Sequence, residues 1–292
     1  MTGSGGAPAP RFEPDWRRTV HLIGDLHAGA ITDVRMRALG ADIGELDPPA
    51  LHLQIGDVTE RGVASEDRLA LRFLERLPGP WITVLGNHDI LGGKRSVRAW
   101  ARAYGQESQN FVIERPFARL LVVGPDRNES GERAGRLSRA TLSFLDEELG
   151  RSGEDCWIAC HWPLERTVMG NPKLHFTSAM PAFHAKPDER IRELLAEHPN
   201  AKLWLSGHTH SPLGVRGLIT RAKLGRRRSI LAINSSALVG VGKTRDPSDP
   251  LCSLYLTHRP GRIEVRCRDH RAGEWRKLRG SYVTALSVAN SR

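Results

Sequence analysis

Polar side chains that can bind metal ions follow five separate strand-like runs of the sequence. Each run is mostly apolar and ends directly on Asp, Asn or His. Because the carboxyl ends of parallel strands lie along one edge of an open α/β sheet, we expect these side chains to converge there. Nitrogen and oxygen ligands without a thiolate favour Mn, Fe, Zn or Co over a structural cysteine-type zinc site. The residues concerned are Asp25, His27, Asp57, Asn87, His88, His161, His208 and His210.

Each of these clusters has a simpler explanation when it is taken alone. Asp25 can cap the turn that follows it, and Asn87 suits a left-handed turn. A histidine after a strand is often only a hydrogen-bonded residue at the rim of a sheet. Five such clusters in series weaken that explanation, and the combination indicates a functional site.

The series of motifs resembles that of the calcineurin-like metallophosphoesterase family. The resemblance covers roughly residues 19 to 257, and all motifs occur in the family's order. It implies an α/β fold, a four-layer sandwich of two mixed β-sheets flanked by helices, and a metal-dependent phosphoesterase that hydrolyses ester bonds. The motifs are Asp25-x-His27, Gly56-Asp57 with Gly62, Gly86-Asn87-His88-Asp89, His161, and Gly207-His208-Thr209-His210.

The same resemblance implies a binuclear centre and its ligands. Two cations about 3.5–4 Å apart can activate a water and stabilise both the attacking and the leaving oxygen at phosphorus. Their identity among Mn, Fe, Zn and Co stays open, as does their divalent or trivalent state. The implied ligands are Asp25, His27 and His210 for one ion, Asn87, His161 and His208 for the other, and Asp57 as the bridge between them.

The resemblance also assigns catalytic roles. A hydroxide that bridges the ions attacks the phosphoester, and Asp57 counts as catalytic because it bridges them. His88 resembles the family histidine that contacts the phosphate and protonates the leaving group. Together with His88, Asn87 is expected to contact the substrate.

The stretch from Gly56 to Gly62 bears on the substrate. Its Gly-Asp-x-Thr-x-x-Gly form resembles the bacterial cyclic-nucleotide phosphodiesterase branch of the family. It is also similar to the phosphoprotein phosphatase pattern, with Glu60 in place of Asp and with Arg61 retained. In that branch the acidic residue orients the catalytic histidine, and the arginine binds terminal phosphate oxygens, which favours a dianionic monoester. We expect a phosphodiesterase acting on a nucleotide or cyclic nucleotide, with a phosphomonoesterase that uses Arg61 as the alternative.

The periodicity of the chain predicts elements that position these motifs. Strands are expected over residues 19–23, 50–55 and 81–85, paired in parallel, with helices over 34–46 and 65–77, the second capped by Ser65. Further strands are predicted over residues 110–113, 118–123, 156–160 and 202–205, with helices over 96–104, 138–149 and 188–198. Short alternating runs after residue 211 suggest a second, antiparallel sheet. The Pro-rich stretch 162–187 is long enough to be a functional lid.

Domain organisation follows from composition. Residues 1–18 are predicted to form a mobile leader, residues 19–280 a single domain, and residues 281–292 a C-terminal tail. Four cysteines match no zinc or redox spacing and are expected to be buried and reduced. Without a long apolar run or a secretory signal pattern, we expect a cytoplasmic protein with no membrane partner.

Charge keeps one further class of partner open. Residues 214–292 hold 17 Lys and Arg against 5 Asp and Glu, whereas residues 1–213 hold 26 against 28. A basic region can attract nucleic acid, so a nuclease is a minority alternative. A non-catalytic binding protein is less expected, because every ligand position is filled. A small-molecule phosphoester is the expected partner, and the sequence does not predict an oligomeric state.

Overall fold

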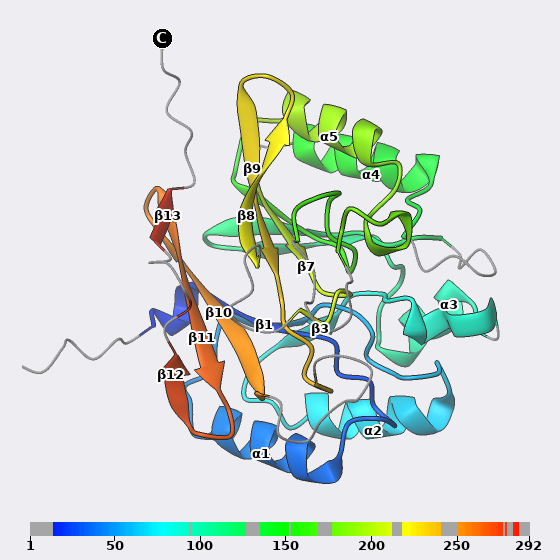
Figure 1. The fold of residues 1–292 in the computed structure, drawn as a ribbon, viewed down its shortest axis with the longest axis vertical. Coiled ribbons are helices and arrows are strands. Elements are labelled where there is room, and N and C mark those ends of the chain that lie inside the picture. The colour runs from blue at the N-terminus through cyan, green and yellow to red at the C-terminus, as the bar shows by residue number, and fades with distance from the viewer. Residues whose placement is uncertain are drawn as a thin grey trace, which may run out of the picture.

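Two β-sheets stack face to face, and helices cover the outer face of each sheet (Figure 1). The computed structural model describes residues 14–93, 95–126, 135–151, 153–168, 177–211, 218–240, 250–276, 278 and 283–285. The expected four-layer sandwich with two mixed sheets is confirmed. Within the described residues, no helix has both the length and the apolar character needed to cross a bilayer.

The first sheet carries the N-terminal motifs. Its strand order is β12-β11-β10-β1-β2-β3, and β13 pairs with β11 beside this path. As predicted, β1, β2 and β3 are parallel, whereas β10 pairs antiparallel with β1. The strands are β1 (Thr19–Ile23), β2 (Leu51–Gln54), β3 (Trp81–Thr83), β10 (Cys252–Arg259), β11 (Arg262–Asp269), β12 (Glu274–Arg276) and β13 (Val283–Ala285).

The second sheet carries the later motifs. Its order is β4-β5-β6-β7-β9-β8, with parallel pairing from β5 through β9 and antiparallel pairs at both edges. Its strands are β4 (Phe111–Arg115), β5 (Ala118–Val122), β6 (Cys156–Ala159), β7 (Ala201–Ser206), β8 (Ile219–Leu224) and β9 (Arg228–Asn234).

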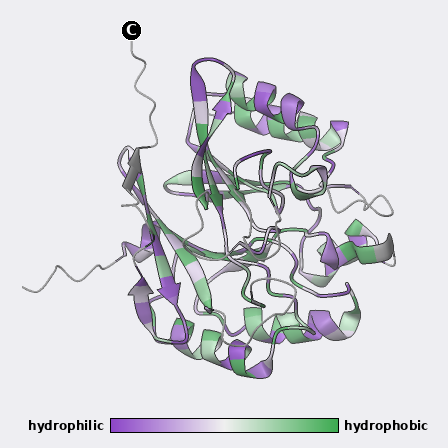
Figure 2. Ribbon diagram, viewed as in Figure 1, coloured by the Kyte–Doolittle hydropathy of each residue, from purple (hydrophilic) through white to green (hydrophobic). Residues whose placement is uncertain are grey.

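Three hydrophobic clusters hold the layers together. One lies between the sheets and joins, for example, Leu22 and Leu53 of the first sheet to Trp157 and Leu205 of the second. The other two lie between each sheet and its helices. Figure 2 shows that the outer helices carry both hydrophilic and hydrophobic residues, as expected when one face of a helix is buried.

Five α-helices form the outer layers of the described chain. Ser96 and Ser138 cap α3 and α4, each accepting a hydrogen bond at 3.1 Å from the backbone N–H three residues on. The helices are α1 (Asp33–Gly44), α2 (Ala64–Leu74), α3 (Val97–Ala103), α4 (Arg139–Gly150) and α5 (Asp188–Glu197). Short 3-10 turns are η1 (Trp16–Arg18), η2 (His88–Gly93) and η3 (Pro181–Phe183).

Two predictions about the elements were wrong. The strands after residue 211 do not form a separate antiparallel sheet, because β8 and β9 extend the second sheet while β10 to β13 extend the first. Ser65 does not cap α2, because the helix begins one residue earlier with Val63 at the cap position. The cysteine prediction is confirmed, since all four thiols are buried and free.

The chain ends differ from the predicted leader and tail. Trp16, inside the expected leader, lies in η1 and packs edge-on against Tyr255 at 5.9 Å between ring centroids. Residues 283–285, inside the expected tail, form β13 and pair with β11. The rest of both segments, residues 1–13 and 286–292, lies outside the described residues.

A buried chain of hydrogen bonds crosses the outer face of the first sheet. Nδ1 of His21 lies 2.8 Å from Nδ1 of His52, and Nε2 of His52 donates to the Pro78 carbonyl at 2.9 Å. On its other side His21 contacts Ser253, which contacts His270. Burial lowers the pKa of His52 to about 4 and lowers that of His21 well below its usual range.

We expect acid to destabilise the fold through His52. With a folded pKa of about 4 and an ordinary value of 6.5, the unfolded chain binds a proton between these pH values that the folded chain does not. The stabilisation is therefore complete above pH 6.5 and is lost as the pH falls towards 4, at about 1.4 kcal/mol per pH unit per proton. Urea unfolding between pH 7 and pH 5 should show a shallower loss of stability for His52→Gln than for the wild type. Identical slopes would contradict this assignment.

Candidate metal centre

The two sheets bring their motifs together at the carboxyl ends of strands. Asp25 and His27 follow β1, Asp57 follows β2, and Asn87 follows β3 in the first sheet. In the second sheet, His161 follows β6, and His208 and His210 follow β7. Three groups of side chains that could hold a metal ion result within the described residues, with ligand atoms within 4.8 Å of one another in each group. The first two share Asp57 and are Asp25, His27, Asp57 and His210, and Asp57, His161 and His208; the third is His27, Glu60 and His88.

The Asp57 carboxylate is shared between the first two groups. Its Oδ2 lies 3.6 Å from Nε2 of His27 and 3.3 Å from Nε2 of His161. Its Oδ1 accepts a hydrogen bond from the backbone N–H of His88 at 2.8 Å. One oxygen is therefore held by the backbone, and the other faces both groups.

The first group is closed by contacts across the sheets. Nε2 of His210 lies 3.1 Å from Oδ2 of Asp25 and 3.1 Å from Nε2 of His27. Both oxygens of Asp25 also accept from the backbone N–H of His208, at 3.2 and 3.0 Å. Two ring nitrogens facing one another with a carboxylate beside them match the ligand set of a transition metal.

The second group includes an amide that the family resemblance assigns to the metal. Nδ1 of His208 lies 3.2 Å from Nε2 of His161, so two ring nitrogens again face each other. Oδ1 of Asn87 is buried and makes no hydrogen bond within the described residues. A buried amide oxygen without a partner is costly, and a cation would satisfy it. The residues present therefore fit a second metal ion.

The outer nitrogens of the histidines fix which nitrogen faces the centre. Nδ1 of His161 contacts the Ile55 carbonyl at 2.8 Å, and Nε2 of His208 contacts the Ala182 carbonyl at 3.1 Å. A carbonyl only accepts, so these ring nitrogens carry the proton and the opposite nitrogens offer a lone pair. Such outer contacts orient metal-binding histidines and raise their basicity.

Backbone strain is concentrated at the same residues. Five described residues other than glycine have a positive φ, and four of them are His27, Asp57, His208 and His210. This conformation is unfavourable for residues with a side chain and persists where the surrounding structure enforces it, often at functional sites. Glycine makes the close packing possible, since a Cβ on Gly86 would lie 2.1 Å from the backbone nitrogen of Asp57.

The charges of the centre alter the protonation of one ligand. Burial by itself lowers the pKa of His161, but the neighbouring carboxylates of Asp57 and Asp25 outweigh it and raise the pKa to about 9. A ring nitrogen must lose its proton to bind a metal. Cation binding at this position would therefore release a proton, as is usual for histidine sites.

Glu60 lies beside the centre and contacts two histidines in different ways. Its Oε2 contacts Nδ1 of His27 at 2.7 Å, whereas its backbone carbonyl accepts from Nδ1 of His88 at 2.8 Å. The Glu60 carboxylate is 3.9 Å from His88. The resemblance to the phosphatase pattern predicted that the Glu60 carboxylate orients His88. In the structure, the shorter contact of this carboxylate is to His27.

Arg61 lies on the rim, outside both groups of ligands. Its side chain is 70% exposed, and Nε donates to Oε1 of Glu66 at 3.0 Å. Glu66 also accepts from the backbone N–H of Arg61 at 2.7 Å, so one carboxylate holds both groups of this residue.

The expected lid is only partly within the described chain. Residues 169–176, which include His175 and Phe176, lie outside it. The described part supplies the Ala182 carbonyl that holds His208, and the Phe183 ring lies 5.2 Å from the ring of His208. His184 is buried, with Nδ1 at 3.1 Å from the Met180 carbonyl.

Two residues that support the centre were missed by the sequence interpretation. Asp89 is fully buried and accepts from the backbone N–H groups of Thr59 and Gly86, at 2.9 Å each, so it ties the loop after β2 to the loop after β3. Burial and the charge of Asp57 raise its pKa to about 6. Its place in the Gly86–Asp89 motif was the available signal.

Asn234, at the end of β9, supports the turn that carries His208 and His210. Its Nδ2 donates to the Gly207 carbonyl at 2.6 Å and to Oγ of Ser206 at 3.0 Å. Its Oδ1 accepts from Oγ1 of Thr209 at 3.1 Å. No motif marked this residue, because it is brought to the turn only by the pairing of β7 with β9.

Loss of Asn234 should weaken metal binding. Asn234→Leu keeps the approximate size of the side chain but removes three hydrogen bonds that shape the turn, so we expect Mn²⁺ affinity to fall about 10–100-fold, as for other outer contacts of metal ligands. Calorimetric titration of the metal-depleted protein with Mn²⁺ measures this directly. Asn200→Leu is the matched control, because Asn200 is a buried amide that donates to the Leu149 carbonyl away from the centre. Equal metal affinities in the two variants would contradict the role.

Comparisons with known proteins bear on the family and the fold. A protein from Synechococcus sp., described as a probable cyclic nucleotide phosphodiesterase, is 29% identical over 206 residues, which cover 69% of this chain and 74% of that protein. The crystal structure of a dimetal phosphatase from Danio rerio shares the fold, with a TM-score of 0.60 at 14% identity over 88% of this chain and 97% of that one. The sequence profile of calcineurin-like phosphoesterases matches residues 18–212. The chain therefore belongs to the calcineurin-like phosphoesterase family and is a metal-dependent phosphoesterase.

Proposed function

We propose that the protein hydrolyses a phosphodiester, with a cyclic nucleotide as the expected class of substrate, at a centre of two metal ions. One observation carries the proposal: two groups of ligand atoms share the carboxylate of Asp57. A shared carboxylate offsets the repulsion between two cations held close together. The Synechococcus relative, described as a probable cyclic nucleotide phosphodiesterase, supports the choice of substrate.

The proposed ligands divide between the two sheets. When bound, two cations supply an activated water and stabilise negative charge on the phosphate oxygens. Mn, Fe, Zn and Co all suit imidazole, carboxylate and amide donors. The chain contributes Asp25, His27 and His210 on one side, Asn87, His161 and His208 on the other, and Asp57 between them.

His88 is the proposed proton donor to the leaving alcohol. The Glu60 carbonyl holds Nδ1, and Nε2 makes no hydrogen bond within the described residues, so it is available to a substrate. Burial by itself lowers the pKa of His88, but the charge of Asp57 and the hydrogen bond to Glu60 raise it above the ordinary value. A protonated imidazole beside the centre suits donation to a leaving oxygen and contact with the phosphate.

The position of the Arg61 side chain supports a diester substrate over a monoester. An arginine that recognises the terminal oxygens of a monoester must direct its guanidinium at them in a two-pronged contact. Here Nε of Arg61 is bound to Glu66, and the side chain is largely exposed. The phosphomonoesterase alternative depends on Arg61 leaving this ion pair.

Asp57→Asn should abolish metal-dependent hydrolysis of bis(p-nitrophenyl) phosphate and of a cyclic nucleotide. The substitution keeps the shape of the side chain but removes the shared negative charge, so we expect a loss larger than the roughly 10–100-fold typical of an outer contact. Asp67→Asn is the control: Asp67 is a buried carboxylate that accepts from Arg95 and Tyr104, outside the centre. Full activity of Asp57→Asn would refute the proposed function.

Arg61→Ala should separate the diester from the monoester. Since Arg61 is bound to Glu66, we expect kcat/KM for bis(p-nitrophenyl) phosphate and for p-nitrophenyl phosphate to change by less than about 3-fold, near the effect of a surface substitution. Arg68→Ala, at an exposed position of α2, controls for the loss of one surface charge. A selective fall in the second activity would instead support the phosphomonoesterase.

A further inference from the structure

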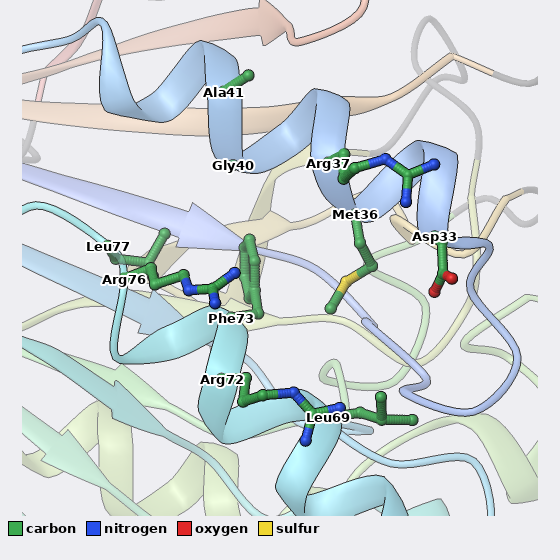
Figure 3. Close-up of a pocket in the computed structure, with 10 residues that line it drawn as sticks. All are labelled: Asp33, Met36, Arg37, Gly40, Ala41, Leu69, Arg72, Phe73, Arg76 and Leu77. Atoms are coloured by element: carbon green, nitrogen blue, oxygen red, sulfur yellow. The ribbon is translucent and has the colours of Figure 1, made fainter.

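A groove between α1 and α2 lies on the outer surface of the first sheet, away from the metal centre. Its cavity has a volume of about 350 Å³, and Met36, Phe73 and Leu77 line it with apolar surface. Figure 3 shows Met36 of α1 and Phe73 of α2 between the two helices. The groove is thus built from two adjacent helices over an apolar floor.

The rim of the groove is basic. Arg37 comes from α1, Arg72 comes from α2, and Arg76 comes from the turn that follows α2 (Figure 3). All three are exposed, and within the described part of the chain none of them makes a hydrogen bond or an ion pair. The one acidic lining residue, Asp33, lies at the start of α1. Guanidinium groups without partners above an apolar floor are complementary to a ligand that has acidic and apolar groups side by side.

Gly40 keeps the groove open. It lies in the interior of α1 and lines the cavity, and a Cβ added to it would have no atom within 4 Å. Glycine is unfavourable in the middle of a helix, and the packing of this chain does not require it there. Its position is explained if an occupant approaches the α1 backbone.

The dimensions and the exposed apolar residues select a peptide over a small metabolite. The lining residues of α1 span nine positions, 33–41, or about 12 Å at the rise of an α-helix, and the opposite wall runs from Leu69 in α2 to Leu77 just after that helix. This length corresponds to about two turns of a third helix laid in the groove. Leu69, which lines the groove, extends its apolar surface and is 37% exposed.

We propose that this groove binds an amphipathic helix of a partner protein, with apolar residues at i and i+4 against Met36 and Phe73 and acidic residues against Arg72 and Arg76. The apolar residues of the partner lose contact with water, and its carboxylates satisfy guanidinium groups that have no partner within the described chain. The site is independent of the phosphoesterase reaction and would recruit the enzyme to a partner.

The test is a selection from a phage-displayed library of random 16-residue peptides on the wild-type protein, with counter-selection on the R72E/R76E variant. We expect enriched peptides in which acidic residues flank apolar residues spaced i and i+4. The affinity of an enriched, fluorescein-labelled peptide, measured by fluorescence anisotropy, should fall at least 10-fold in R72E/R76E and in Gly40→Trp, which fills the groove. Hydrolysis of bis(p-nitrophenyl) phosphate should be unchanged in both variants, and thermal unfolding should show no loss of stability in either.

A matched control separates the groove from bulk charge. R98E/R102E makes the same change at the same spacing on α3, where both arginines are exposed, and should bind the peptide within 2-fold of the wild type. The proposal is overturned by the absence of enrichment, by enrichment of neutral or basic peptides, or by equal losses in the two double variants. It is also overturned if the wild type sediments as a dimer and R72E/R76E as a monomer, because the groove would then be an interface between two copies.

Discussion

A buried carboxylate shared by two sets of ligands organises this molecule. Asp57 is 1% exposed, and the second buried acid, Asp25, lies beside it in the same centre. Two negative charges removed from water are very unfavourable unless opposite charge or hydrogen-bond donors compensate them. The backbone N–H groups of His88 and His208 provide part of that compensation, and cations would provide the rest.

The two-sheet architecture explains how the ligands reach one place. Each sheet contributes parallel strands whose carboxyl ends point to the same edge, so short loops after β1, β2 and β3 face those after β6 and β7. The loops must then turn sharply, which accounts for the positive φ of His27, Asp57, His208 and His210. The core between the sheets fixes the distance across which the ligands meet. Packing far from the centre therefore sets the geometry within it.

The sequence predicted the parts of this site that are local and missed those that depend on distant pairing. The ligands stand directly after apolar runs, and their order matches the family, so both the strands and the side chains were recognisable. Asn234 was not, because it reaches the Gly207 turn only through the pairing of β9 with β7. The Ala182 carbonyl is a backbone group and carries no residue-type signal.

The fold showed the same division between local and distant information. Helices α3 and α4 were predictable from periodicity, since a helical pattern is contiguous in the chain. The placement of β10 beside β1 was not predictable. Thr257 and Thr19 pair across 238 residues, and a short alternating run does not indicate which strand it pairs with. The predicted cap at Ser65 was wrong because the turn at Gly62, which Glu66 holds, starts α2 one residue earlier than the cap pattern suggests.

The arginines of the chain show why net charge alone predicts little about partners. In the basic C-terminal region, Arg268 is bound to Asp42 of α1, Arg266 to Glu264, and Arg276 to Asp269. The first pair joins β11 to α1, the second lies within β11, and the third joins β12 to β11, so part of the positive charge there is already matched. The arginines around the α1–α2 groove lie in the N-terminal part, where acidic and basic residues nearly balance. A free guanidinium is a matter of local geometry, and a regional count of charges does not reveal it.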